Sequence, residues 1–103
     1  MKVMVTFSFP AEGGNSVVRS GKIKDIFGNL MADLKPEAAY LYPVGGQRGG
    51  HFTVNITDSS EVAGIAERFW HGLSADVEMT PVMGPEDLQK GLSGMGEIIK
   101  KFG

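Results

Sequence analysis

The chain has 103 residues, enough for a single domain, and a formal net charge of -2. Its Lys and Arg residues are scattered rather than clustered, which argues against a surface for nucleic acid or anionic membranes. The absence of cysteine excludes disulfides, thiol nucleophiles, iron–sulfur clusters and cysteine-based zinc sites, and two histidines alone do not complete a zinc site. We expect no metal and no cofactor.

No apolar run approaches the ~20 residues that a membrane-spanning helix needs. Residues 1–10 are too short and too strand-like for the apolar region of a secretory signal, and no small-residue cleavage site follows them. We therefore expect a cytoplasmic protein without membrane contacts, organised as one domain over residues 1–103.

The first predicted element is a strand over residues 2–9. Apolar side chains occupy every second position there, the period of two that indicates a strand with one buried face. Pro10 ends the strand, because proline cannot donate a hydrogen bond to a ladder. The alternating apolar residues are Val3, Val5, Phe7 and Phe9.

A helix is predicted next. Asn15 or Ser16 is expected to cap its N-terminus, and Pro36 ends it by pushing Lys35 out of helical geometry. Apolar residues recur at helical spacing along this segment. They are Ile23, Ile26, Phe27, Leu30, Met31 and Leu34.

Residues 39–44 are predicted to form a short second strand with Tyr40 and Tyr42 on one face, and Pro43 favours the edge of the sheet. The glycine-rich residues 45–50 are predicted to be a loop. A third strand follows and alternates again. Its apolar side chains are Phe52, Val54 and Ile56, and its polar ones are His51, Thr53, Asn55 and Thr57.

Asp58 followed by Glu61 resembles a capping box and predicts the start of a second helix. The stripe of that helix consists of Val62, Ile65, Ala66, Phe69 and Leu73. A fourth strand follows over residues 75–83, with Val77 and Met79 in its apolar row and Asp76, Glu78 and Thr80 opposite.

A C-terminal helix is predicted over about residues 85–102, because Pro85 followed by acidic residues is typical of a helix N-terminus. Three glycines weaken this helix, so it needs a packing partner. Its apolar stripe predicts that it packs on the domain or on a partner. The stripe consists of Leu88, Leu92, Met95, Ile99 and Phe102.

The predicted order is strand, helix, strand, strand, helix, strand and a tail helix. Two split βαβ units with right-handed crossovers give an α+β fold of the ferredoxin-like βαββαβ type, with a four-stranded antiparallel sheet of spatial order 4-1-3-2. The helices are expected on the face that carries the apolar rows. The other face then carries mixed polar residues, and a chain this small favours covering it with a second copy. We therefore expect a homodimer.

Three short segments resemble an uncharacterised bacterial domain family of unassigned function within the dimeric α/β-barrel (ferredoxin-like) superfamily. They are the opening residues 1–6, the helix over residues 58–70 and residues 76–82. The resemblance covers roughly the first 85 residues. It implies a homodimer whose two sheets pack face to face into a barrel, and it implies no established activity. The wider superfamily includes monooxygenases, lactone isomerases and stress-responsive dimers, whose catalytic residues have no counterpart here position by position.

A small-molecule site, if the protein has one, is expected on the helix-free face. Thr6 lies between the strand that carries His51 and the strand that carries Glu78, so these side chains can converge without a long loop. An imidazole is a suitable general acid or base near neutral pH, although a histidine on a polar strand is more often solvated. The candidate ligand-binding residues are His51, Asn55, Thr6, Glu78, Tyr40 and Tyr42.

Other motifs are interpreted structurally. His71 is expected to interact with the C-terminus of its helix, and Trp70 to lie in the core or an interface. The glycine loop precedes a strand, whereas a phosphate-binding P-loop precedes a helix. RNA recognition is disfavoured because Gly50 stands where a stacking aromatic residue is needed.

Two functions stay open at this point. The first is a homodimeric small-molecule-binding or structural domain. The alternative is a small cofactor-independent enzyme, such as an isomerase or monooxygenase, that acts in the barrel cavity. Convergent polar groups in a closed cavity would favour the enzyme, and a filled or open face would favour the first.

Overall fold

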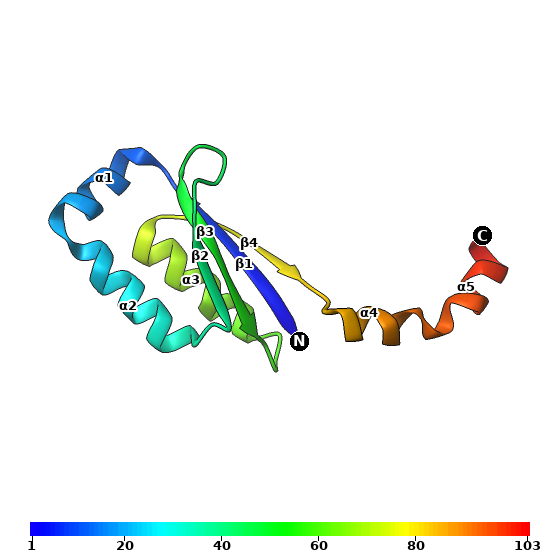
Figure 1. Cartoon of the computed structure of the whole chain (residues 1–103). Coiled ribbons are helices and arrows are strands. Elements are labelled where there is room, and N and C mark those ends of the chain that lie inside the picture. The colour runs from blue at the N-terminus through cyan, green and yellow to red at the C-terminus, as the bar shows by residue number, and fades with distance from the viewer.

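The computed structural model describes residues 1–103 (Figure 1). No helix in it is long and apolar enough to cross a bilayer. The elements, in chain order, are β1 (Lys2–Phe9), α1 (Ala11–Ser20), α2 (Lys22–Leu34), β2 (Ala38–Leu41), β3 (Arg48–Asn55), α3 (Glu61–Leu73), β4 (Asp76–Pro81), α4 (Pro85–Gly91), a 3₁₀ turn (Leu92–Gly94) and α5 (Met95–Phe102).

The four strands form one open antiparallel sheet with the order β2-β3-β1-β4, which is 4-1-3-2 when read from the β4 edge. The α+β class and the four-stranded antiparallel sheet are therefore confirmed. β1 and β3 are central and pair along all eight residues of each strand. β2 is an edge strand, but Pro43 lies beyond its end.

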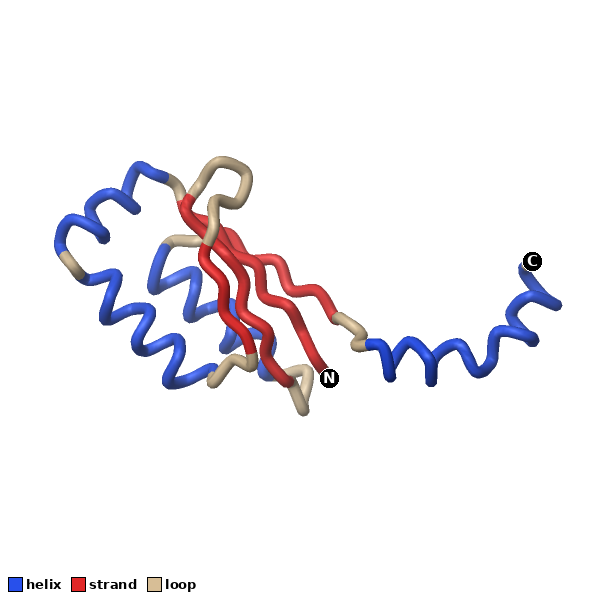
Figure 2. The backbone as a smooth tube through the Cα atoms, in the orientation of Figure 1, coloured by secondary structure: helices blue, strands red, loops and turns tan.

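The core lies on one face of the sheet. The apolar side chains of β1 are buried at every second position, and Phe69 of α3 contacts Phe7 and Phe52 with ring centroids 4.9 and 5.7 Å apart. Helices α1, α2 and α3 all lie on this side, and the other side carries no helix (Figure 2). The predicted assignment of the apolar rows to the helix-covered face is thus confirmed.

The first helical segment differs from the prediction. α1 starts at Ala11, but Glu12 and Gly13 have non-helical backbone angles, so its continuous part begins at Gly14. Asn15 and Ser16 lie within this part and do not cap it. Gly21, with a φ of 79°, ends α1 and separates it from α2, because a left-handed residue interrupts a right-handed helix. The side chain of Asn15 instead accepts a hydrogen bond from Arg48, with a distance of 2.8 Å.

The predicted glycine loop is shorter in the structure. β2 ends at Leu41, a tight turn is closed by the Val44–Gln47 bridge, and β3 begins at Arg48. The last two residues of the predicted loop, Gly49 and Gly50, are therefore strand residues. They extend the central strand because hydrogen-bonded pairing with β1 continues as far as Phe9.

The start of α3 carries hydrogen bonds to both residues of the predicted capping box, Asp58 and Glu61. The carboxylate of Glu61 accepts hydrogen bonds from the backbone N–H groups of Thr57 and Asp58. The side-chain carboxylate of Asp58 accepts from the backbone N–H of Ser60, whereas the backbone carbonyl of Asp58 accepts from the N–H of Glu61. These hydrogen bonds lower the pKa of the Glu61 carboxyl, with the backbone of Asp58 making the largest contribution.

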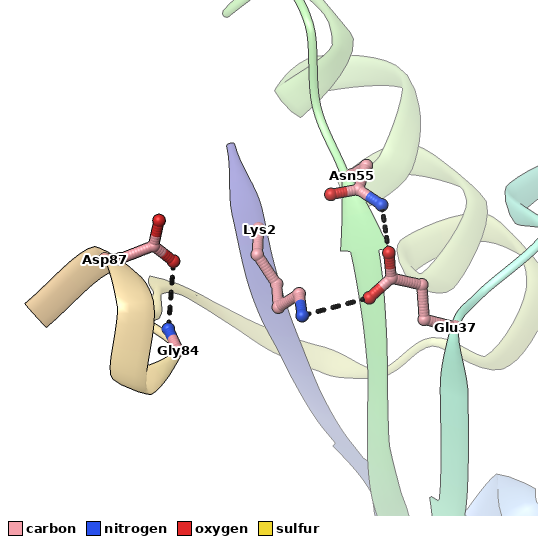
Figure 3. A network of polar contacts seen from close by, with 5 residues as sticks. All are labelled: Lys2, Glu37, Asn55, Gly84 and Asp87. Carbon is pink, nitrogen blue, oxygen red and sulfur yellow. Dashed lines mark hydrogen bonds and ion pairs between the residues drawn. The ribbon is translucent and has the colours of Figure 1, made fainter.

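The C-terminal segment leaves the domain (Figure 1). It is two short helices joined by a 3₁₀ turn rather than one helix, and its stripe residues Leu88, Leu92, Ile99 and Phe102 are exposed. The predicted packing of this helix on its own domain is therefore wrong for the single chain. The Gly84 N–H donates to Asp87 at 3.0 Å, which anchors the start of α4 (Figure 3).

Candidate functional site

Four of the six predicted site residues form a row across the helix-free face. In the pairing register, Tyr40 lies opposite His51, His51 opposite Thr6, and Thr6 opposite Glu78. Directly opposed residues have Cβ atoms about 4.5–5.5 Å apart, so each of these side chains lies beside the next. The row therefore crosses all four strands and places a hydroxyl between an imidazole and a carboxylate.

Tyr42 joins the row from beyond the end of β2. Its hydroxyl lies 2.7 Å from Nδ1 of His51, and the rings of Tyr40 and Tyr42 lie 5.5 and 5.6 Å from the imidazole, measured between centroids. The imidazole is thus held between two aromatic rings by one hydrogen bond. Its Nε2 has no hydrogen-bond partner within the chain and is available to a ligand.

Gly50 makes this arrangement possible. Its φ of 153° lies outside the range of most side chains, and a Cβ placed on it would collide with the backbone carbonyl of Tyr40. Because Gly50 lacks a Cβ, the β2 backbone approaches β3 just before His51. Gly50, which occupies the position where RNA recognition would need an aromatic residue, therefore has a structural role: it allows Tyr40 to lie beside His51.

Asn55 does not belong to this row. It lies on the same face as His51 but four residues further along β3, opposite Lys2. There its amide donates to the carboxylate of Glu37, which also pairs with the Lys2 ammonium at 3.2 Å (Figure 3). The hydrogen bond from Asn55, and then that from Lys2, lowers the pKa of Glu37. Asn55 thus forms a separate surface cluster with Lys2 and Glu37.

The chemistry that the row offers is limited. His51 and Thr6 are half-buried, whereas Glu78 and Tyr40 are exposed, so in one chain the row is an open surface rather than a cavity. No group of three or more His, Asp or Glu side chains is close enough to hold a metal ion. The row can donate and accept hydrogen bonds and can move a proton at Nε2 of His51.

The remaining singled-out residues lie on α3, away from the row. His71 is in the last turn, as expected, and its Nε2 lies 2.9 Å from a carboxylate oxygen of Glu67. Trp70 is half exposed in the single chain. Of the two placements predicted for Trp70, the core is thus not observed, and an interface stays a prediction.

A second candidate site was not predicted. A pocket of about 270 Å³ opens at the β2 edge, on the side of the sheet that carries the helices. Arg48 and Tyr42 border it. Its apolar wall consists of Phe9, Ile23, Phe27, Leu41 and Pro43.

The pocket lies where the edge strand stops. β2 ends at Leu41, and Ile23 and Phe27 of α2, which pack against the core, form the facing wall of the pocket. The sequence signal for it was the short apolar segment between Pro36 and the glycines, which is too short to cover a helix of 13 residues.

No protein-family model, no curated protein and no solved structure matches this chain in the comparisons with known proteins. The features of the structure that bear on function are an open sheet face with a polar row, a projecting apolar tail and an apolar pocket at the β2 edge.

Proposed function

We propose that this chain is a homodimeric small-molecule-binding or structural domain of the dimeric α/β-barrel type, in which the helix-free faces of two sheets pack together. The observation that carries the proposal is the open face itself, with His51 held between two tyrosines in the middle of it. The strand order and the two helical crossovers support a ferredoxin-like assignment, in agreement with the sequence resemblance.

The small core supports a second copy. Only 16 of the 103 residues are buried, so the single chain leaves much apolar surface in water. Met4 and the two tyrosines give the open face an apolar component, and its threonines tolerate burial against a second sheet. Two such faces would pack about 10 Å apart and place each His51 row in the space between them.

The sheet face alone is smaller than a typical stable interface, so a dimer would also bury the C-terminal segment. Strands of eight, eight, six and four residues cover roughly 400 Å² at the usual strand spacing and rise, whereas a stable interface buries about 800 Å² per partner. The exposed stripe on α4 and α5 can supply the difference. A dimer would therefore combine the sheet face with the projecting segment.

The alternative function is a small cofactor-independent enzyme, of the isomerase or monooxygenase kind, acting in the barrel cavity. The Tyr42–His51 hydrogen bond favours it, because a base held at Nδ1 presents Nε2 in one direction. Such an enzyme would need the two rows to close around a substrate.

Light scattering tests the proposal. The wild type is expected to have about twice the chain mass of 11.0 kDa. Thr6→Glu puts a carboxylate opposite Glu78 in the centre of the face and is expected to give a folded monomer. Lys24→Glu changes a charge on the exposed surface of α2 and is the matched control, expected to stay dimeric. A wild-type mass of 11.0 kDa at all micromolar concentrations would contradict the proposal.

A further inference from the structure

The pocket at the β2 edge lies on the helix-covered side of the sheet, whereas the His51 row lies on the other side, and Tyr42 borders both. The chemistry of the pocket differs from that of the row. We propose that it binds a small amphipathic carboxylate, with the apolar body between α2 and β2 and the carboxylate on Arg48. This site goes beyond the proposed dimer and does not depend on it, because all of its residues come from one chain.

The wall of the pocket selects an apolar body. Ile23 and Phe27 of α2 face Leu41 of β2, and Leu41 is 64% exposed in the single chain. A volume of about 270 Å³ lies just below the range of roughly 300–1,000 Å³ typical of ligand pockets, so the occupant must be small. An alkyl chain of medium length is the body that this space and this wall fit.

Arg48 supplies the charge. One guanidinium nitrogen donates to Asn15 at 2.8 Å, which fixes the side chain against α1. No carboxylate of the chain lies within 4 Å of this guanidinium. Its remaining N–H donors therefore face no internal anion. A carboxylate is the ligand group that a guanidinium binds through two parallel hydrogen bonds.

Arg48 also lies between two neighbouring hollows. A second hollow, of about 310 Å³, adjoins the pocket and shares Arg48 and Pro43 with it. This hollow adds the side chains of Asn15 and Gln47 beside Arg48, although most of its exposed lining is apolar. The two hollows therefore meet at one cation. That juxtaposition matches a molecule with an apolar chain and one anionic end, with the end held at Arg48.

Isothermal titration with octanoate tests the site, with 1-octanol as the uncharged probe of equal chain length. The wild type is expected to bind octanoate saturably and at least tenfold more tightly than octanol, because hydrogen bonds to a charged group are the stronger kind. Arg48→Gln is expected to lose at least tenfold of the octanoate affinity and little of the octanol affinity. Arg19→Gln, on an exposed part of α1 outside the pocket, is the matched control and is expected to bind like the wild type.

Leu41→Glu is the second variant, and it places a carboxylate on the exposed wall without touching the core. It is expected to abolish octanoate binding while the circular dichroism spectrum stays unchanged. Amide chemical-shift changes on adding octanoate are expected at Phe27 and Gly49. Changes confined to His51 and Thr6, equal affinity of the wild type and Arg48→Gln, or no saturable binding at millimolar octanoate would each overturn the assignment. None of these outcomes depends on whether the protein dimerises, which light scattering measures separately.

Discussion

Tyr42 and His51 are joined across the end of the β2–β3 pair, with the tyrosine hydroxyl 2.7 Å from Nδ1 of the imidazole. Tyr42 lies outside any strand, so this hydrogen bond ties the start of the turn to the centre of the helix-free face. It fixes the orientation of the only histidine on that face. The ring of Tyr40, in the strand itself, packs on the same imidazole without a hydrogen bond from its hydroxyl.

Tyr42→Phe is expected to release the imidazole while keeping the aromatic contact. The variant should change the tautomer populations of His51 and should lower the free energy of unfolding by about 0.5–1.5 kcal/mol, the usual net contribution of one hydrogen bond. Ring ¹⁵N chemical shifts and urea unfolding measure the two effects. Tyr40→Phe is the matched control and should change neither. Equal behaviour of the two variants would mean that the hydrogen bond does not orient His51.

The Glu37 carboxyl is expected to titrate below the usual range for glutamate, because Asn55 and then Lys2 stabilise its charged form. A group whose pKa is lower in the folded state stabilises the fold above its unfolded pKa. That contribution is lost as the pH falls through the folded pKa. Asn55→Ala should raise the pKa of Glu37 toward its ordinary value and weaken this acid dependence, as followed by ¹³C NMR titration. Asn29→Ala, on α2, should leave the Glu37 titration unchanged, and an unchanged titration in Asn55→Ala would refute the assigned cause.

Gly50→Ala is expected to be strongly destabilising, by about 1–3 kcal/mol or more, because the new Cβ collides with the Tyr40 carbonyl. Gly28→Ala makes a good comparison. A Cβ at Gly28 meets no atom within 4 Å, and the residue is inside α2, so alanine should stabilise by about 0.5–1 kcal/mol. Thermal unfolding of both variants measures the contrast. If both substitutions change the stability in the same direction, the backbones of β2 and β3 do not approach closely at Gly50.

The projecting segment is expected to contribute to association and little to the fold of its own domain. Deleting the residues after Met83 should leave the circular dichroism of the remaining domain intact and weaken dimerisation at least tenfold, because each buried leucine stabilises by about 1.5–3 kcal/mol. Leu92→Gln, within the apolar stripe, should weaken dimerisation in the same direction. Lys90→Gln, on the polar side of α4, should not. An unchanged dimer dissociation constant after the deletion would show that the stripe has no partner.

The sheet and its buried face could be predicted from the sequence because a period of two leaves no alternative arrangement for Val3, Val5 and Phe7. The division of the first helical segment at Gly21 was not predicted. Residues 11–20 include two adjacent glycines and several polar side chains, which lower intrinsic helix propensity. Gly14 is buried against the Phe9 ring, where a Cβ would fit too tightly, so tertiary packing decides the structure of this segment.

The candidate site was predictable in part for the same physical reason. Alternation places Thr6, His51 and Glu78 on one face, but it does not set how far one strand is shifted along the next. The observed register of β3 against β1 places Asn55 opposite Lys2, away from the row. The course of the chain after β2 brings Tyr42 to His51. The pocket at Arg48 depends on where β2 stops, and the strand predicted over residues 39–44 runs past the observed end at Leu41. For the tail, an apolar stripe predicts that a packing partner is needed but not whether the same chain or a second copy supplies it.

The packing of two helix-free faces against each other is tested most directly by intermolecular NOEs in a mixed sample of ¹³C-labelled and unlabelled chains. We expect cross-peaks between copies that involve the Met4 methyl group and the Tyr40 ring, and we expect Thr6→Glu to abolish them. Intermolecular cross-peaks confined to the opposite side of the molecule, for example to Trp70 on α3, or none at all, would contradict the face-to-face dimer.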